Sequence, residues 1–278
     1  MNHSAFSILG LEIRWYGILI SISLMLGVCI TYLLAKYRGQ KQEDVLSFAP
    51  FAILFSIIGA RLVHVAANWS YYMVHPSLIL NFRSGGLAIH GVIMGGFIAL
   101  IIFVKVKKLD LWLWSDILVP GLILGQAIGR WGNYFNQEAF GRPTTLPWGI
   151  FIEAGHRPYA FRNYEYFHPT FFYESMLNLT LFVLLLAMHR YYKNKPGRMP
   201  SGLIFSAYLG IYAVYRTVVE SLRIDSAYIG SIRIVYLINL VVLIAAIIIA
   251  AYLLKRKTKD ASLNDRRDDL VLLEKRVR

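Results

Sequence analysis

The 278-residue sequence has few of the residues on which common soluble-enzyme sites are built. Its single cysteine, Cys29, excludes an internal disulfide framework and a CxxC redox or zinc pattern. No two of the seven histidines lie three or four residues apart, and no HExxH stretch is present. A Walker loop, a GxGxxG stretch before a helix and a GxSxG elbow are also missing. We therefore expect no metal and no cofactor.

Charged residues are missing from long stretches of the chain, which is 57% hydrophobic. Runs of about 20 nearly uncharged residues recur, each long enough at about 1.5 Å per residue to cross a hydrocarbon layer of about 30 Å. The N-terminus lacks the basic region and cleavage site of a signal peptide, so the first run is expected to stay in the protein. The sequence predicts an all-α polytopic membrane protein with seven transmembrane helices, at residues 15–35, 48–68, 86–104, 112–130, 171–189, 203–222 and 233–254.

The lysines fall only in alternate connections between these spans and in the C-terminal tail. Because lysine and arginine are retained on the cytoplasmic side of short loops, the N-terminus is predicted outside and the C-terminus in the cytoplasm. The net charge of +13 is concentrated in the same segments, which suits an anionic inner leaflet, and nucleic acid is not expected as a partner. The lysines are Lys36, Lys41, Lys105, Lys107, Lys108, Lys193, Lys195, Lys255, Lys257, Lys259 and Lys275.

Two segments stand apart from the spans. Residues 131–169, between spans four and five, are rich in aromatic residues, which indicates a small external head resting at the membrane interface. Residues 148–153 are compatible with a short strand in this head. We therefore expect a seven-helix transmembrane catalytic domain at 1–254 that includes the head, followed by a charged cytoplasmic tail at 255–278. A short helix is expected in the tail over 270–276.

Polar side chains are predicted to share one depth, toward the outer leaflet. With the orientation fixed, each lies at the outer end of its span, and scattered structural polar residues would not share a level. A guanidinium at membrane depth is tolerated when it faces a protein interior, a water-filled cavity or an anion such as a lipid phosphate. These residues are Tyr16, Arg61, His64, His90, Arg130, Asn133, Tyr173, Glu174, Arg216, Glu220 and Arg223.

Span six carries four of its polar residues on one face. Tyr212, Arg216, Glu220 and Arg223 are spaced four, four and three residues apart, so they fall within an arc of roughly 80° of a helix. One interpretation is an Arg216–Glu220 ion pair that holds helices together. The other is an anion site, which the arginines of other spans favour, because they outnumber the carboxylates available for pairing.

Histidines and glycines mark the starts of two spans. Gly91 and Gly95 follow His90 at the small-xxx-small spacing of helix packing. His90 is equally compatible with a hydrogen-bonded structural histidine and with a proton acceptor. His168 precedes a proline at the start of span five, and there a structural role is favoured.

Five short motifs occur in the order found in one family. GRWGNYFNQEAFGRP at 129–143 ends span four with a guanidinium, two amides and a carboxylate, and RWYG at 14–17 precedes it. IHG at 89–91, HPT at 168–170 with YE at 173–174, and YR at 215–216 through Glu220, Arg223 and Asp225 complete the set. From about residue 14 to 233 the chain resembles the bacterial prolipoprotein diacylglyceryl transferase family. It departs at Val92, where many members have a second glycine, and the tail beyond 254 lies outside the resemblance.

The resemblance implies a transferase of the bacterial cell (inner) membrane that performs the first step of lipoprotein maturation. Such an enzyme moves the sn-1,2-diacylglyceryl group of phosphatidylglycerol to the lipobox cysteine of a prolipoprotein signal peptide, with membrane lipids around it. A thioether forms and glycerol phosphate leaves. Guanidiniums in a water-poor site stabilise the charge on a departing phosphate, and a base or a positive field helps to ionise a thiol whose ordinary pKa is about 8.5.

The resemblance also suggests individual roles. Arg130 and Arg216 would hold the lipid phosphate and stabilise the leaving group, and His90 would accept or relay the thiol proton. The headgroup would be positioned by polar side chains around the arginines, with Glu220 orienting Arg216 and Tyr16 capping the site. The expected substrate-binding residues are Arg130, Tyr16, Asn133, Asn136, Glu138, Glu220 and Arg223.

Three other functions use similar residues. An anion transporter would carry polar residues on toward the cytoplasm, whereas the inner halves of the spans are almost wholly apolar. Another phospholipid-headgroup transferase would share most of this site and differ in its acceptor. A noncatalytic scaffold is disfavoured by the shared depth of the polar groups.

Overall fold

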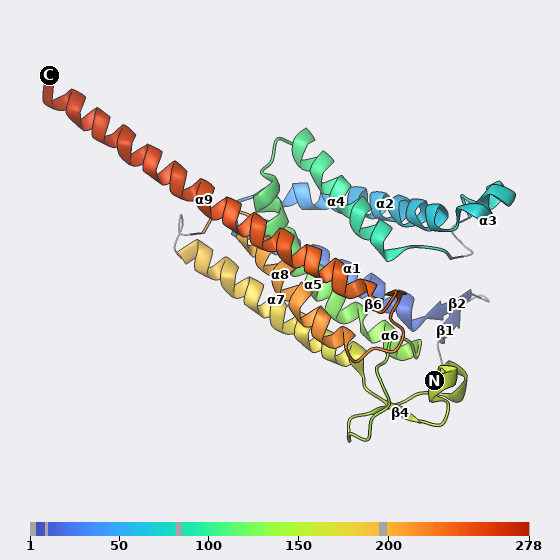
Figure 1. Cartoon of the computed structure of the whole chain (residues 1–278). Helices are drawn as coiled ribbons and strands as arrows, with labels where there is room; N and C mark the ends of the chain where they lie inside the picture. The colour runs from blue at the N-terminus through green and yellow to red at the C-terminus, as the bar shows by residue number, and fades with distance from the viewer. Residues whose placement is uncertain (1–3, 9–10, 82–84, 195–198, 278) are drawn as a thin grey trace. The chain divides into compact units, whose positions relative to one another are not determined.

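The computed structural model describes residues 4–8, 11–81, 85–194 and 199–277 (Figure 1). The chain forms two compact units, a larger one of Met1–Cys29 with Leu118–Arg278 and a smaller one of Ile30–Ile117. Seven helices in the described residues are long and apolar enough to cross a membrane, which confirms the predicted class. They lie at Trp15–Tyr37, Gln42–Ala67, Ile89–Val106, Leu111–Phe135, Thr170–Asn194, Leu203–Glu220 and Ile234–Lys257.

Several helices extend beyond the predicted apolar spans. Helix α2 begins at Gln42 rather than at 48, and α7 continues to Asn194 rather than ending at 189. The apolar run marks only the part of a helix that crosses the hydrocarbon layer, and the helix can continue beyond it. At the start of α2, Glu43 and Asp44 stabilise this extension because their negative charges complement the helix dipole. The long helices are α1 (Trp15–Tyr37), α2 (Gln42–Ala67), α4 (Ile89–Val106), α5 (Leu111–Gly129), α7 (Thr170–Asn194), α8 (Leu203–Glu220) and α9 (Ile234–Val277).

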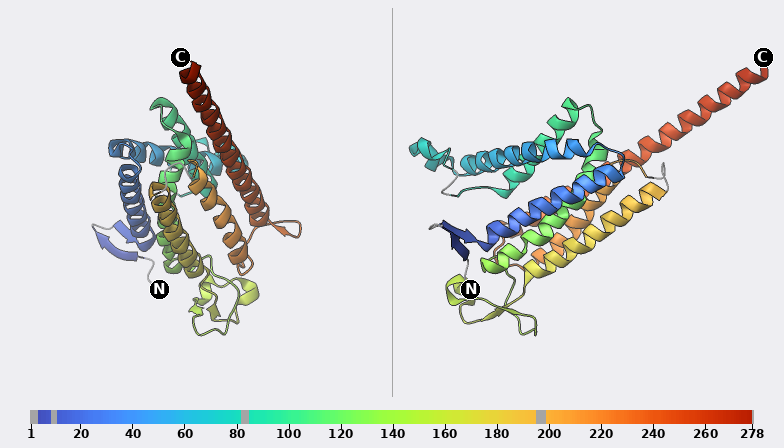
Figure 2. Two further views of the ribbon diagram at one scale, coloured as in Figure 1. Left: turned by 90° about the vertical axis from the view of Figure 1, so that its left-hand side faces the viewer. Right: turned by 180° about the vertical axis from the view of Figure 1, so that it is seen from behind.

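In the smaller unit, α2 and α4 lie side by side because glycines bring their backbones together (Figure 2). A Cβ added to Gly91 would lie 2.2 Å from the carbonyl oxygen of Gly59, and one added to Gly95 would lie 2.1 Å from that of Phe55. No side chain fits at such distances. The small-residue spacing read from the sequence is therefore a helix-packing device.

In the larger unit, α8 packs against both α7 and α9 (Figures 1 and 2). The apolar core joins α5, α7 and α8 through Val119, Ile123, Leu181, Leu185 and Ile204. Polar side chains cross the same interfaces, since Gln126 of α5 donates to the hydroxyl of Tyr208 and the Tyr215 hydroxyl donates to Asn178 of α7. These hydrogen bonds fix the register of the three helices that carry the site.

The segment between α5 and α7 forms the expected head (Figure 1). The short helix α6 (Trp131–Phe135) follows α5 directly, and β3 (Ile150–Phe151) pairs antiparallel with β4 (Tyr166–Phe167), which confirms the predicted strand. Phe140, Ile152 and Phe167 form a small apolar core. The Trp148 indole and a ring nitrogen of His168 both hydrogen-bond the hydroxyl of Tyr173, at 2.8 and 3.2 Å, and so tie the head to α7.

Other elements were not predicted from the sequence. An antiparallel pair, β1 (Ser4–Ile8) and β2 (Leu11–Arg14), precedes α1, the pair β5 (Tyr228–Ile229) and β6 (Ile232–Arg233) joins α8 to α9, and α3 (Trp69–Val74) follows α2. Each is short, so its hydrophobic period is weak. Residues 270–276 are helical as expected, but they are the end of α9, which is continuous from Ile234 to Val277, and not a separate helix.

Replacing Gly91 by alanine is expected to lower the free energy of unfolding by about 1–3 kcal/mol, because the added methyl group overpacks the α2–α4 contact. Thermal unfolding of the purified protein in detergent measures the change. Gly17→Ala in α1 is the matched control, since a Cβ there meets nothing within 4 Å. Equal melting temperatures for the two variants would contradict the close approach of the two backbones.

Candidate functional site

A buried carboxylate lies at the centre of the polar residues of the larger unit. Glu174 is in the first turns of α7, and its side chain is only 2% exposed. Its Oε2 lies 2.5 Å from Nη2 of Arg130, which follows the last residue of α5. Its Oε1 lies 3.3 Å from Nη1 of Arg223 and 3.9 Å from Nη1 of Arg216. Three guanidiniums therefore converge on one carboxylate.

A second buried carboxylate, Glu220, joins the group from the last turn of α8. Its Oε2 lies 2.7 Å from Nη1 of Arg216, one turn earlier, and 3.9 Å from Nε of Arg223. The structure thus confirms that Arg216 and Glu220 lie on one face of this helix. Arg223 is different, because α8 ends at Glu220 and Arg223 reaches the group from the turn that follows.

Arg223 is held on all three of its guanidinium nitrogens. Nε and Nη2 donate to the two carboxylate oxygens of Asp225, at 2.9 and 2.6 Å, while Nη1 donates to Glu174. Burial raises the pKa of Asp225, but the hydrogen bonds and positive charge of Arg223 outweigh burial and hold this pKa below its ordinary value. We call Arg130, Glu174, Arg216, Glu220, Arg223 and Asp225 the arginine–carboxylate cluster.

Arg233 supports this cluster from β6 and is buried. Its guanidinium donates to the backbone carbonyl of Glu220 and to the hydroxyl of Tyr228, and it lies over the rings of Tyr228 and Tyr236. The structure shows no carboxylate partner for it among the described residues. The six residues of the cluster carry three positive and three negative charges, so the cluster together with Arg233 has a net charge of +1.

The arginines differ in how many donors they have left. A guanidinium offers five N–H groups. Among the described residues, Arg130 contacts a carboxylate through Nη2 alone and Arg216 through Nη1 alone. Arg130 is also the most exposed of the three, at 25% of its side chain against 12% for each of the others. Arg130 and Arg216 can therefore bind an additional anion, whereas Arg223 is committed to the protein.

Next to Arg130, Glu138 orients two amides. Its Oε1 accepts hydrogen bonds from Nδ2 of Asn133 and Nδ2 of Asn136, both at 3.1 Å. The amide oxygens remain as acceptors for hydroxyl groups. The three predicted headgroup-binding residues thus form one hydrogen-bonded group at the end of α6.

The backbone around Glu138 is strained. Gln137 and Ala139, on either side, have φ of 49° and 56°, a left-handed conformation that is unfavourable for residues other than glycine. The Gln137 side chain accepts from the backbone N–H of Glu153 at 2.7 Å, and the Thr170 hydroxyl donates to the carbonyl of Ala139. The head and the start of α7 therefore hold Glu138 in place.

Tyr16, at the start of α1, lies against Gly132 of α6. A Cβ added to Gly132 would lie 2.4 Å from Cδ2 of the Tyr16 ring, so only glycine allows this approach. The contact is reinforced by stacking of Trp15 on Phe135, with ring centroids 5.1 Å apart. Tyr16 is thus brought beside the residues that follow Arg130.

The smaller unit holds the remaining predicted polar residues. His90 is exposed in the first turn of α4. Arg61, which the sequence counted among the guanidiniums free for an anion, instead donates to the backbone carbonyls of Leu78, Ile79, Gly85 and Gly86 at 2.5–3.0 Å. Arg61 therefore organises the connection between α2 and α4. An arginine on an apolar helix can either bind backbone carbonyls in this way or bind an anion, and the sequence does not distinguish the two.

Sequence reasoning underestimated Glu174 and missed Arg233. From the sequence, Glu174 is counted among the polar residues of the outer level but is given no role in the site, although burying an acidic residue at the head of an apolar span requires cations nearby. The role of Arg233 depends on the unpredicted β5–β6 pair. The assembled site can bind one anion close to neutral hydrogen-bonding groups in a water-poor setting.

Comparisons with known proteins agree on one family. The family model for prolipoprotein diacylglyceryl transferase matches residues 3–252. Similar proteins named phosphatidylglycerol–prolipoprotein diacylglyceryl transferase include that of Acaryochloris marina, 44% identical over 82% of this chain and 82% of its own. Those of Trichormus variabilis and of a Synechocystis species are 43% and 41% identical, covering 89% and 92% of this chain and 88% and 92% of their own.

Replacing Glu174 by glutamine is expected to destabilise the larger unit by about 3–5 kcal/mol, because removing one partner leaves buried charges uncompensated. Thermal unfolding in detergent measures this. Glu138→Gln is the control, since Glu138 is exposed and its side-chain partners among the described residues are the two neutral amides of Asn133 and Asn136. If Glu174→Gln melted at the same temperature as the wild type and Glu138→Gln, the cluster would not depend on Glu174.

Proposed function

The chain belongs to the prolipoprotein diacylglyceryl transferase family, and we propose that its arginine–carboxylate cluster is where phosphatidylglycerol gives up its diacylglyceryl group. The protein is a multi-pass membrane transferase that acts on phosphatidylglycerol and prolipoproteins. The acceptor atom is the thiol of the lipobox cysteine in the prolipoprotein signal peptide. The products are a thioether-linked diacylglyceryl protein and glycerol phosphate.

One observation carries the assignment: the cluster with Arg233 has one positive charge more than its carboxylates neutralise. The phosphodiester of phosphatidylglycerol carries one negative charge, so its binding neutralises the cluster together with Arg233, while the exposed Glu138 carboxylate is solvated. Burial of unmatched charge is costly, and charge matching of this kind favours an anionic lipid over a zwitterionic one.

Arg130 and Arg216 hold the phosphate. Both have free N–H groups, and they approach Glu174 from different helices, so a phosphate beside that carboxylate meets both. A guanidinium can bind two phosphate oxygens with parallel hydrogen bonds. Glu220 orients Arg216, and Arg223 supports the site by fixing the turn after α8 to Glu174.

The headgroup glycerol lies against the amides beside Arg130. The oxygens of Asn133 and Asn136 accept from its two hydroxyls, while Glu138 fixes both amides. Tyr16 closes the other side of this pocket because its ring lies on Gly132. These contacts recognise the hydroxyl groups of the headgroup glycerol, whereas the arginines recognise the charge of the phosphate.

The chemical step exchanges a carbon–oxygen bond for a carbon–sulfur bond. The thiolate sulfur attacks the glyceryl carbon attached to the phosphate oxygen, and that oxygen leaves with the bonding electron pair as part of glycerol phosphate. Arg130 and Arg216 bind the departing phosphate more strongly as its charge grows, which lowers the barrier. From the resemblance, not from the geometry of the cluster, we expect His90 to accept or relay the thiol proton.

The predicted orientation suits this chemistry. The cluster lies at the end of the larger unit where α7 begins and α5 and α8 end, and the alternate lysine-rich connections support an external position for that end. Exported precursors present their signal peptides there.

The direct test is to incubate the purified protein with phosphatidylglycerol and a peptide bearing a lipobox cysteine, and then to weigh the peptide. We expect a gain of one diacylglyceryl group and release of glycerol phosphate. A peptide with serine in place of the cysteine is the control and should gain nothing. Folded protein that adds no mass to the cysteine peptide would overturn the assignment.

In the same assay, Arg130→Gln and Arg216→Gln are each expected to lower kcat/KM by about 10²–10³, the usual effect of removing one donor from an anion-stabilising site. Arg162→Gln is the matched control and should keep wild-type activity, because Arg162 is an exposed arginine of the head that lies over the Tyr159 ring and forms none of the ion pairs of the cluster. Melting temperatures report whether each variant is folded. Full activity in folded Arg130→Gln and Arg216→Gln would exclude both arginines from phosphate binding.

His90→Asn is expected to lower kcat about a hundredfold at neutral pH while leaving KM for phosphatidylglycerol nearly unchanged, since general-base catalysis contributes at least that much. The loss should shrink as pH rises toward about 8.5, where the thiol ionises without a base. The pH profile of kcat checks this. Near-full turnover at neutral pH would remove the base assignment and leave the arginine roles intact.

A further inference from the structure

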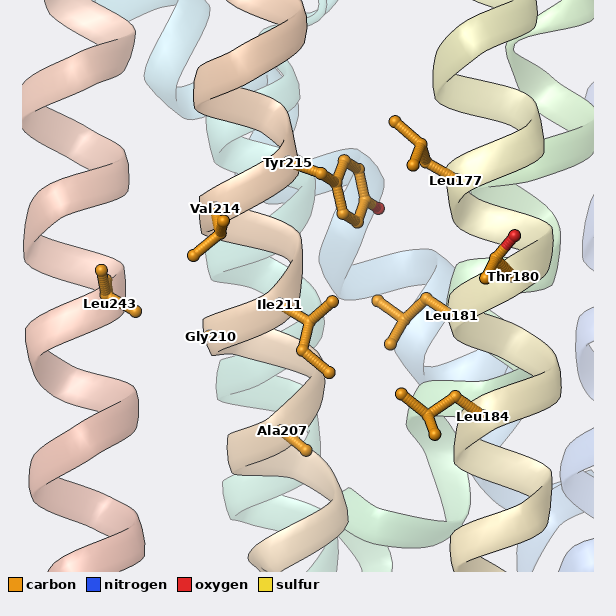
Figure 3. Close-up of a pocket in the computed structure, with 10 residues that line it drawn as sticks. All are labelled: Leu177, Thr180, Leu181, Leu184, Ala207, Gly210, Ile211, Val214, Tyr215 and Leu243. Atoms are coloured by element: carbon orange, nitrogen blue, oxygen red, sulfur yellow. The ribbon is translucent and has the colours of Figure 1, made fainter.

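An apolar groove runs along α7 and α8 in the larger unit (Figure 3). Its volume is about 460 Å³, within the range of about 300–1,000 Å³ that is usual for small-molecule sites. Leu177, Leu181 and Leu184 line the α7 side, and Ala207, Ile211 and Tyr215 line the α8 side. The lining is almost entirely hydrocarbon, so the groove suits an aliphatic chain.

One end of the groove lies near the arginine–carboxylate cluster along both helices. Glu174 lies on the same face of α7 as Leu177, Leu181 and Leu184, because these positions follow it by three, seven and ten residues. Leu177 is therefore only about 4.5 Å further along the helix axis than Glu174. On α8, Tyr215 precedes Arg216 directly, and Figure 3 shows its ring turned toward α7 near Leu177.

The lining of the groove continues from the cluster end toward the middle of the helices. From Leu177 to Leu184 the α7 wall runs about 10 Å, and Ala207 and Leu184 lie at the end remote from Tyr215 (Figure 3). A molecule with an anionic head at the cluster and a hydrocarbon tail in the groove would satisfy both surfaces at once.

The position of the groove favours a lipid tail over a peptide helix as its occupant. A phosphate held by Arg130 and Arg216 places the diacylglyceryl group of the same molecule at the end of the groove that lies near the cluster. The walls come from neighbouring helices that pack on each other through Leu181, Leu185 and Ile204. An extended acyl chain is therefore the expected occupant.

We propose that this groove binds an acyl chain of the phospholipid substrate and sets the chain length that the enzyme prefers. The inference rests on the proposed function. With the phosphate on Arg130 and Arg216, the diacylglyceryl group extends from the cluster past Tyr215, and one chain lies between the leucines of α7 and the small residues of α8. Ala207 at the remote end limits how far that chain reaches.

The test compares phosphatidylglycerols with acyl chains of 8 and of 16 carbons as donors, using the full chain in phosphatidylcholine nanodiscs and a lipobox peptide as acceptor. Ala207→Phe fills the remote end, so we expect the ratio of kcat/KM for the long donor over the short donor to fall about tenfold, as excluding even one methylene from an apolar pocket can cause. Leu184→Ala enlarges the same end and should raise that ratio.

Ala251→Phe is the matched control, because Ala251 is exposed on α9 and does not line the groove. It should leave the ratio and the activity unchanged. An unchanged ratio in both Ala207→Phe and Leu184→Ala would overturn the proposal, as would a change in KM for the peptide alone, which would assign the groove to the signal peptide. Wild-type protein that lipidates no peptide with either donor would refute the proposed function itself, so the two failures are distinguishable.

Discussion

The ion pairs around Glu174 are the constraint on which the larger unit depends. One buried carboxylate holds guanidiniums from the end of α5, from α8 and from the turn after α8, so three distant parts of the sequence meet at one point. Neither Glu174 nor the arginines could be buried in an apolar helix bundle alone, because each would be an uncompensated charge in a low-dielectric setting. The same pairing leaves N–H groups of Arg130 and Arg216 free in a water-poor place, where an anion is bound most strongly. Stability and anion binding thus come from one arrangement.

The surrounding structure gives this centre its selectivity. Strained backbone at Gln137 and Ala139 fixes Glu138, which in turn fixes the amides of Asn133 and Asn136, and Gly132 admits the Tyr16 ring. Arg233 adds the single excess charge through a buried contact with the end of α8. On the other side, the apolar groove begins one turn from Glu174. In the proposed mode of binding, these three surfaces with different chemistry take the polar headgroup, the phosphate and an acyl chain.

Much of this was readable from the sequence, and the reasons for the exceptions are physical. Seven uncharged runs predict seven helices because the hydrocarbon layer sets a minimum length, and the spacing of Arg216 and Glu220 predicts one face because helical periodicity is strict. The sequence misplaces the start of α2 and the end of α7, because hydropathy marks the residues that lie in the hydrocarbon layer and not the residues that are helical. The function of Arg61 depends on a nonlocal loop whose carbonyls it binds, and that of Arg233 on a two-residue pairing too short to leave a pattern. Local periodicity, including the Arg216–Glu220 pair, is therefore visible in a sequence, whereas the choice of a nonlocal partner for a buried charge is not.

The central claim is that Arg130 and Arg216 together bind the phosphate of phosphatidylglycerol beside Glu174. The most direct measurement is the dipolar coupling between the lipid ³¹P nucleus and ¹⁵N-labelled arginine side chains, by solid-state NMR of the protein in nanodiscs. We expect strong coupling to guanidinium nitrogens in the wild type, reduced by Arg130→Gln and by Arg216→Gln and unaffected by Arg162→Gln. Strong coupling that persisted in the double variant Arg130→Gln/Arg216→Gln would place the phosphate elsewhere and contradict the claim.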